Sequence, residues 1–393
     1  MVQIPTLYFG LAVCAVAAST VEVSAIGVAG PVAAAAPDLE LVADFGWGSQ
    51  PTGVAVATSG RIFVSFPRWF TNFTGPSVAE VRADGSTVPY PNEELNTWKK
   101  GEDGSDKFVC IQSVFIDHYD RLWILDPGNA YLGTAIVDGA LPNITKNAPK
   151  LMRVNLTTNQ VEQTIHFDET VAPIHSYLND VRVSADGKWA FMSDSNMGGI
   201  KVVNLETHEA RVLLGDHPST HSEANTTPVV EGQPMILTNG QVAAFQSDGI
   251  AVIEDELYYH AVTARTLYKI AINLLTDPTK SKSDVEEGVQ KVALSGMPDG
   301  MVLVGDSDLK GTLYMTAVEK DGIDYLSNDG FNRVLPFLSN ELLEWPDSLA
   351  CAVLDEKGDN YLYVTASQVN TAPFIKDARP RRNPYQLYRA KLP

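Results

Sequence analysis

The stretch that decides the fold runs from Leu178 to Ser195 and reads Leu-Asn-Asp-Val-Arg-Val-Ser-Ala-Asp-Gly-Lys-Trp-Ala-Phe-Met-Ser-Asp-Ser. Its first part alternates between side chains of different polarity, and Asp186-Gly187 is a turn signal. The residues after the turn are mostly apolar and aromatic. Alternation, a Gly-containing turn and a second apolar run are typical of a β-hairpin.

Five further stretches repeat this hairpin pattern. The apolar residues that correspond to one another in the six copies are Val54, Val114, Val181, Ile250, Met301 and Leu349. They are separated by 60, 67, 69, 51 and 48 residues. A hairpin unit repeated at such intervals, without helical periodicity between the copies, is typical of a propeller. The sequence therefore predicts an all-β fold, a six-bladed β-propeller.

The beginning of the chain has a different composition. Leu7 to Ala18 is an apolar run of the length found in signal peptides, and small residues near Ala18 and Ala25 offer cleavage sites. We expect a signal peptide over 1–25 that is cleaved between 18 and 25, a flexible Ala/Val-rich leader over 26–37, and a single propeller domain over 38–393.

Both ends of the predicted domain read as strands. Leu39–Phe45 and Tyr385–Leu392 each show an alternating pattern. Because a propeller must join its first blade to its last, we expect these two segments to pair within one blade, which removes free sheet edges.

The charge balance limits the classes of partner. The chain has 29 Lys and Arg against 48 Asp and Glu, a formal net charge of −19. Such a surface repels phosphate backbones and anionic lipids, so nucleic-acid binding and membrane insertion after signal cleavage are disfavoured. A neutral or cationic small molecule is the more natural partner.

Export is also indicated by possible glycosylation sites. Four Asn-x-Ser/Thr triplets begin at Asn72, Asn143, Asn155 and Asn225, and they favour a secreted, extracellular glycoprotein. After the leader, only Cys110 and Cys351 remain. They are either two buried free thiols or one bridge across the ring, and the sequence leaves both readings open.

The candidate site comes from a column of the repeat. The residues two positions before the corresponding apolar residues are Thr52, Gln112, Asn179, Asp248, Asp299 and Asp347. Since the innermost strands of a propeller line its axis, we expect these side chains to form a polar ring in the solvated mouth of the central channel. Three adjacent carboxylates repel one another unless a cation, a proton or a hydrogen-bond donor lies among them.

Three functions fit such a ring. Asn179, Asp248 and Asp299 could hold Ca²⁺, which prefers oxygen ligands. The ring could instead bind an organic ammonium group, with aromatic residues a few positions upstream as pocket walls; these are Trp47, Phe108, Tyr177, Phe245 and Trp345. Alternatively, Asp248 or Asp347 acts as a proton-transferring group.

Further polar residues accompany these readings. Gln112 and Asn179 would position a bound ligand, and His175 and Tyr177 could add a base or a hydrogen-bond donor at the rim. The structural alternative is that each Asp of the ring caps the turn into its strand.

Three blades resemble a known family. Arg121-Leu122-Trp123-Ile124-Leu125-Asp126-Pro127-Gly128 resembles the "DRLWVLD-G" signature of the yellow/major royal jelly protein family. Gln246–Ile250 with Leu257-Tyr258-Tyr259, and Trp345–Ser348 with Leu362-Tyr363-Val364, are similar to its "SDG…LYF" and "FPADV…WV" segments. The resemblance implies a secreted six-bladed propeller. Members are linked to dopachrome conversion, to binding of biogenic amines, or to nutrition.

A more distant resemblance is to calcium-dependent gluconolactonases, which hold an axial metal with Glu, Asn and Asp. Asn179 and Asp248 match two of these positions, but Gln50-Pro51-Thr52 stands where the Glu is expected. Asp299 or Asp347 could supply the missing charge.

We therefore expect a secreted propeller that binds a small aromatic or amine-bearing metabolite in its axial pocket, requires no cofactor, and has tautomerase-like isomerase activity if it is an enzyme. The alternatives are a Ca²⁺-dependent lactonase and a non-catalytic binding or storage protein.

Overall fold

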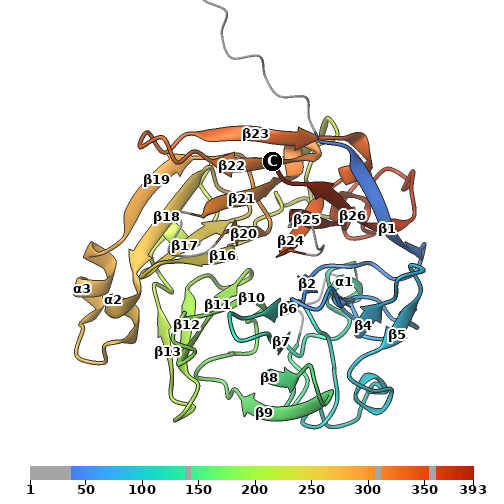
Figure 1. Ribbon diagram of the computed structural model, residues 1–393, viewed down its shortest axis with the longest axis horizontal. Helices are drawn as coiled ribbons and strands as arrows, with labels where there is room; N and C mark the ends of the chain where they lie inside the picture. The colour runs from blue at the N-terminus through green and yellow to red at the C-terminus, as the bar shows by residue number, and fades with distance from the viewer. Residues whose placement is uncertain (1–36, 138–142, 306–310, 354–359) are drawn as a thin grey trace, which may run out of the picture. The chain divides into compact units, whose positions relative to one another are not determined.

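Six four-stranded antiparallel sheets surround a common axis (Figure 1). The structure, a computed structural model, describes residues 37–137, 143–305, 311–353 and 360–393. The predicted all-β, six-bladed β-propeller is confirmed. The expected signal peptide and nearly all of the expected leader lie outside the described residues.

The blades follow one another along the chain, each from the axis outward. Blade I consists of β2 (Val54–Val56), β3 (Ile62–Ser65), β4 (Val78–Val81) and β5 (Thr87–Pro89). Blade II consists of β6 (Ser113–Ile116), β7 (Arg121–Asp126), β8 (Lys150–Asn155) and β9 (Gln160–His166). Blade III consists of β10 (Leu178–Val183), β11 (Trp189–Asp194), β12 (Ile200–Asn204) and β13 (Ala210–Leu213).

Blade IV consists of β16 (Ser247–Ile253), β17 (Glu256–Ala261), β18 (Thr266–Ala271) and β19 (Gln290–Leu294). Blade V consists of β20 (Met301–Val304), β21 (Thr312–Ala317), β22 (Gly322–Leu326) and β23 (Val334–Ser339). Blade VI consists of β24 (Pro346–Val353), β25 (Asn360–Ala366), β26 (Tyr385–Lys391) and β1 (Leu39–Gly46).

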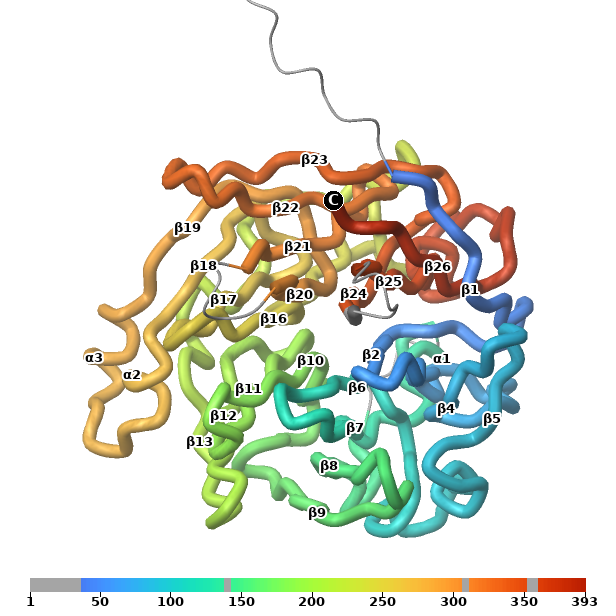
Figure 2. The backbone as a smooth tube through the Cα atoms, viewed as in Figure 1, coloured from blue at the N-terminus to red at the C-terminus, as the bar shows by residue number. Residues whose placement is uncertain are grey.

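The innermost strands are those that the repeat predicts. Each of the six corresponding apolar residues lies on β2, β6, β10, β16, β20 or β24. These strands contact one another in that order, and β24 returns to β2 (Figure 2). Blade II therefore lies across the axis from blade V.

Blade VI closes the ring as expected from the two ends of the domain. β1 pairs antiparallel with β26, with Leu39 opposite Ala390 and Gly46 opposite Tyr385. The blue N-terminal strand and the dark red C-terminal strand lie side by side in Figure 1. Because the first strand of the chain completes the last blade, unfolding of either end exposes a sheet edge.

Apolar side chains fill the space between neighbouring blades. Trp123 of blade II and Val181 and Met192 of blade III are fully buried in one such cluster. Burying a side chain of this size contributes about 2 to 3 kcal/mol. The same inter-blade packing recurs around the ring, so each inner strand is held in place from both sides.

Helical segments are short and lie in the connections. Those in the part of the chain that the structure describes are η1 (Glu94–Asn96), α1 (Leu132–Val137), η2 (Pro218–Thr220), α2 (Ile272–Thr276), α3 (Lys282–Glu287), η4 (Val318–Lys320), η5 (Glu341–Leu343) and η6 (Val369–Thr371). None of the helices in the described ranges is both long enough and apolar enough to cross a bilayer.

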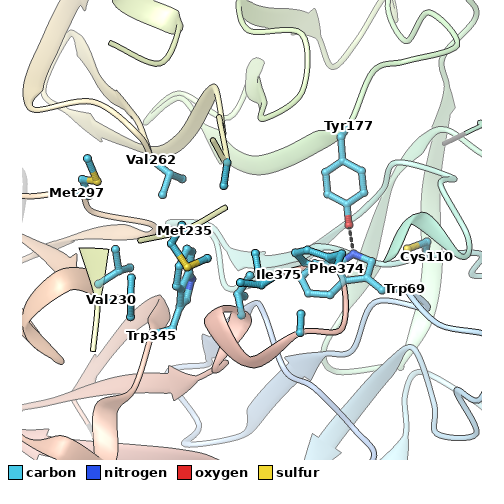
Figure 3. Packing of buried hydrophobic residues seen from close by; sticks show 14 of the residues in the cluster. Trp69, Cys110, Tyr177, Val230, Met235, Val262, Met297, Trp345, Phe374 and Ile375 are labelled. Carbon is cyan, nitrogen blue, oxygen red and sulfur yellow. Dashed lines mark hydrogen bonds between the residues drawn. The ribbon is translucent and has the colours of Figure 1, made fainter. Parts of the chain in front are cut away.

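Two connections together form a lid. The hairpin of β14 (Val229–Val230) and β15 (Gln233–Pro234) continues to Val242, and Leu237 bridges to Ile375. The amide of Lys376 donates to the carbonyl of Ile236 at 2.7 Å. We call residues 229–243 and 369–378 the lid. Its apolar residues pack into one cluster with Trp69, Tyr177 and Trp345, residues next to the predicted ring (Figure 3).

Candidate functional site: a buried acidic pocket on the axis

β-bulges direct the side chains of three ring residues. The pairing of the two inner strands shifts register between Leu178 and Val181, between Ser247 and Ile250, and between Pro346 and Leu349. Asn179, Asp248 and Asp347 lie within these three irregularities. A bulge bends its strand and re-aims a side chain, so the same local defect in blades III, IV and VI points a polar group at the axis.

Glycines let the inner strands of blades IV, V and VI approach closely. A Cβ on Gly249 would lie 2.3 Å from the carbonyl oxygen of Asp299, and one on Gly300 would lie 2.5 Å from that of Asp347. The amide of Gly300 also donates to the carbonyl of Asp347 at 2.8 Å. Only glycine fits at these two positions, and the direct backbone contact brings three aspartates together.

The ring side chains line a cavity of about 110 Å³. The lining side chains from the predicted set are Gln112, Asn179, Asp248, Asp299, Asp347, His175, Tyr177, Phe245 and Trp345. Thr52 is not among the lining residues. It is fully buried, and its hydroxyl donates to the carbonyl of Gln112 at 2.6 Å, which ties blade I to blade II.

The ring is buried rather than solvated. Three residues that were expected in an open mouth are only 5 to 8% exposed: Asp248, Asp299 and Asp347. The expectation of a solvated mouth is wrong, because the lid, α1 and aromatic side chains cover that end of the channel. Burial makes ionisation of these three carboxyl groups far more costly than it is in water.

Burial and mutual repulsion raise the pKa values of all three carboxyls. Burial, reinforced by the charges of Asp299, Asp180 and Asp347, raises the pKa of Asp248 well above its ordinary value. Burial and the charge of Asp299 do the same for the pKa of Asp347. Burial raises the pKa of Asp299 to about 7, although the hydrogen bond from Trp345 opposes this shift. Protonation of these carboxyls therefore relieves much of the repulsion that is expected between the three adjacent carboxylates.

A hydrogen-bond chain indicates where one of these protons lies. The indole N–H of Trp69 donates to the hydroxyl of Tyr177 at 2.6 Å, and that hydroxyl donates to Oε1 of Gln112 at 2.7 Å (Figure 3 shows the first bond). Gln112 must then present Nε2 to Oδ1 of Asn179, at 3.4 Å. Since an indole can only donate, the hydroxyl of Tyr177 must accept from Trp69, which leaves its own proton for Gln112.

The chain ends on a pair of carboxyls. Nδ2 of Asn179 donates to Oδ2 of Asp248 at 2.7 Å. Asp248 and Asp299 share a side-chain hydrogen bond, and the indole N–H of Trp345 donates to Oδ2 of Asp299 at 2.6 Å. Asp299 accepts from Trp345, and the hydrogen bond between the two carboxyls raises the pKa of Asp248 and lowers that of Asp299, which assigns the shared proton to Asp248. The two groups form a dyad with an acid and a base side.

Trp345 holds its position in a strained conformation. Its backbone φ is 49°, in the left-handed region, and its carbonyl accepts a hydrogen bond from Ser367 at 3.0 Å. A bulky residue in this region costs on the order of 1 kcal/mol or more. Such strain is concentrated at functional sites, and here it places the indole N–H on Asp299.

Sequence reasoning missed the pair Asp180 and Arg182. Nη2 of Arg182 lies 3.2 Å from Oδ2 of Asp180, and Arg182 also donates to the carbonyl of Met301 on β20 of blade V, two blades further along the ring. Both side chains are at most 10% exposed. Asp180 contributes charge to all three ring carboxyls. The alternation of Asn179 to Val183 could have suggested an axial arginine, but not its contact with blade V.

Aromatic side chains form part of the walls, though not all of those predicted. Phe245 and Trp345 meet edge to face with ring centroids 6.2 Å apart. Trp47 is 55% exposed and stacks with Arg381, and Phe108 lies in a different core cluster between blades I and II. These two residues do not line the pocket. Leu132, Ile136 and Phe374 complete the apolar side instead.

Comparison with known proteins identifies the family. The model of the major royal jelly protein family matches residues 109–392. The chain belongs to the major royal jelly protein family. Major royal jelly protein 7 of Apis mellifera is 23% identical over 232 residues, 56% of this chain and 46% of that protein. The chain spans about half the length of the curated relatives it matches.

Solved structures agree with this propeller fold. A putative gluconolactonase superposes with a TM-score of 0.52 at 12% identity, covering 91% of this chain and 93% of its own. A luciferin-regenerating enzyme superposes with a TM-score of 0.51 at 11% identity, covering 90% and 94%. At such identities the likeness shows the fold alone.

The side chains of this royal jelly family member fit a calcium site poorly. Asn179 turns its Nδ2 rather than its oxygen toward Asp248, and Oδ2 of Asp299 already accepts from Trp345. Calcium needs six to eight oxygens. Across the described ranges, no group of three or more His, Cys, Asp or Glu side chains is placed to hold a metal ion.

Two buried lysines brace the loops around the pocket. Asp194 accepts from the amide of Tyr177 at 3.0 Å and pairs with Lys201 at 2.7 Å. In blade II, Asp126 accepts from the amide of Cys110 and pairs with Lys150 at 2.9 Å. Asp194 and Asp126 therefore anchor the segments that lead into the inner strands of blades III and II.

The two cysteines within the described ranges are free thiols. Cys110 is fully buried beside this anchor and Cys351 is half-buried on β24. The bridge across the ring, one of the two readings left open by the sequence, does not form in this structure.

Proposed function

We propose that the axial pocket binds a small aromatic amine, with its ammonium group among Asp248, Asp299 and Asp347 and its ring against Phe245 and Trp345. The observation that carries this proposal is a cluster of buried carboxyls in a cavity that is otherwise lined by aromatic, aliphatic and neutral polar residues. An ammonium group satisfies the carboxylates and interacts favourably with aromatic faces. The net charge of −19 also favours a cation over an anion.

The size of the cavity limits the ligand. About 110 Å³ is somewhat less than the roughly 150 Å³ of an engineered cavity that holds benzene. A single-ring amine therefore fits only if the lid moves outward slightly, and a larger fused-ring ligand requires a larger displacement. We propose that the segment around Phe374, which stacks on Phe70 at 6.2 Å, makes this adjustment.

The Asp248–Asp299 dyad also supports an isomerase activity of the tautomerase type. Asp299, with a pKa of about 7, would accept a proton from a carbon of the substrate. Asp248 would give its proton to the carbonyl oxygen that becomes a hydroxyl, so the composition of the substrate is unchanged. A base with a pKa near the working pH is the efficient choice. The sequence also suggested Asp347 as the proton-transferring group, but in this arrangement Asp347 would bind the ammonium group.

The direct test is binding of phenethylamine to the purified protein, measured by calorimetry. Asp347→Asn and Asp248→Asn are expected to weaken binding by at least about tenfold, which corresponds to one charge-assisted hydrogen bond. Toluene-like neutral analogues should bind weakly. Equal affinity for the amine and a neutral analogue would refute the proposal.

Two further measurements separate the alternatives. Turnover of dopachrome by wild type but not by Asp299→Asn would distinguish an isomerase from a binding or storage protein. Addition of calcium or a chelator is expected to leave the melting temperature unchanged, whereas a ligand bound only by the native state would raise it.

We also propose that the mature protein is secreted and glycosylated. Asn72, Asn143 and Asn225 are exposed, as a glycan requires, whereas Asn155 is half-buried and donates to Glu162. A shift in electrophoretic mobility of protein from the culture medium after endoglycosidase treatment tests both statements.

A further inference from the structure

Asn129 is the unexplained polar group of the pocket. Its side chain is only 1% exposed and lines the cavity. Neither its Oδ1 nor its Nδ2 has a hydrogen-bond partner among the residues that the structure describes. The other two buried amides of the cavity, Gln112 and Asn179, are both hydrogen-bonded. A buried amide without partners is costly, so this side chain points to a ligand group.

The backbone prevents Asn129 from turning away. The amide of Gly128 donates to Asp126, and its carbonyl accepts from Thr145 at 2.8 Å. On the other side, the amide of Tyr131 donates to the carbonyl of Arg68 at 2.7 Å. Because both flanks are fixed, the amide stays buried even without a partner.

The position of Asn129 relative to the carboxyls gives the pocket two different ends. Asn129 follows β7 of blade II, and Asp299 precedes β20 of blade V, on the opposite side of the axis (Figure 1). His175, from the loop before β10, lines the same cavity, and its Nδ1 also lacks a partner in the described part of the chain. One end is therefore acidic, and the other offers an amide and an imidazole as hydrogen-bonding groups.

The chemistry of the amide selects the missing group. Oδ1 requires a donor and Nδ2 requires an acceptor. A hydroxyl is the smallest neutral group that supplies both, and a carboxylate would be repelled by the acidic end. We infer that Asn129 is a specificity residue for a hydroxyl group carried by the ligand at the end opposite its ammonium group. This inference rests on the proposed amine binding.

The test compares phenethylamine with its para-hydroxyl derivative by calorimetry. Wild type is expected to bind the hydroxylated amine at least about tenfold more tightly, because the analogue without the hydroxyl leaves the amide unpaired. Asn129→Leu, which keeps the volume and removes the polar atoms, should reduce this preference to less than about twofold. Asn273→Leu, at an exposed position of α2 on the outer part of blade IV, is the matched control and should keep the preference.

Thermal melting provides an independent readout. Since Asn129 has no internal partner, Asn129→Leu should melt at or above the temperature of wild type in the absence of ligand. A clear decrease would mean that the amide has a structural partner, such as a buried water, and would overturn the inference. Equal binding of both amines by wild type, or an unchanged preference in Asn129→Leu, would also overturn it. If wild type binds neither amine, the proposed amine binding itself fails.

Discussion

The replacement Asp299→Asn is expected to make the protein more stable at neutral pH. The pKa of Asp299 is about 7 in the fold against 3.8 for an unperturbed group, chiefly because the carboxyl is buried. The folded state therefore binds this proton more tightly than the unfolded chain does. Its stabilising effect is fully present below about pH 4 and is lost as the pH rises through about 7.

The magnitude follows from the same pKa values. A difference of about three units at 1.36 kcal/mol per unit corresponds to a loss of about 4 kcal/mol between pH 4 and pH 8. Asparagine can still accept a hydrogen bond from Trp345, but it never ionises. We expect Asp299→Asn to exceed wild type by up to about 4 kcal/mol near pH 8 and to match it near pH 4.

Urea denaturation followed by circular dichroism at several pH values measures this difference. Glu254→Gln, on the exposed turn between β16 and β17, is the control for loss of a carboxylate and should show no such pH dependence. If Asp299→Asn is less stable than wild type at neutral pH, the carboxylate must be held by a cation or acts as a turn cap, and the proton-based reading of the pocket is wrong.

Three further predictions concern the scaffold of the pocket. Arg182→Met should lower the free energy of unfolding by about 3 kcal/mol, because it leaves Asp180 buried without its partner. Asp180→Asn in the same chain should restore most of this loss. Additive losses in this double-mutant cycle would contradict the pairing. Gly249→Ala should lower the free energy of unfolding by about 1 to 3 kcal/mol or more, since its Cβ would lie 2.3 Å from a carbonyl oxygen. The control Gly48→Ala, with open space around its Cβ, should be near neutral. Equal melting temperatures of the two variants would refute the close approach. Burial raises the pKa of Cys110 to about 12 and that of Cys351 to about 11. A thiol reagent at neutral pH should therefore label Cys110 only after denaturation. Rapid labelling of Cys110 in the native protein would contradict its burial.

The sequence predicts the fold well because the repeat is encoded locally. Each hairpin carries its own alternation and turn, and six copies admit few architectures. Val181 and Leu349 lie on innermost strands, and Leu39–Phe45 contributes to the strand that closes blade VI, as expected.

The chemistry of the ring was less predictable because it depends on contacts between blades. Nothing local in the sequence indicates that Thr52 bonds to the neighbouring strand or that Arg182 reaches blade V. The lid forms from two segments more than one hundred residues apart, such as Leu237 and Ile375, and it turns the expected solvated mouth into a buried pocket. That burial, rather than the ring itself, raises the pKa values.

Asn129 shows a second limit of sequence reasoning. Its segment, Asp126-Pro127-Gly128-Asn129, reads as a turn, and turns rich in Asn are usually solvated. Only the three-dimensional structure reveals that the amide is buried without a partner.

The most direct test of the central claim is the number of protons released when the amine binds. Titration of the protein with phenethylamine near pH 6, repeated in buffers of different ionisation enthalpy, gives this number. If an ammonium group replaces protons held by Asp248, Asp299 and Asp347, about one proton should be released for each amine bound, and Asp299→Asn should change that number. Binding heats that are identical in all buffers would contradict the claim that protons neutralise the acidic pocket.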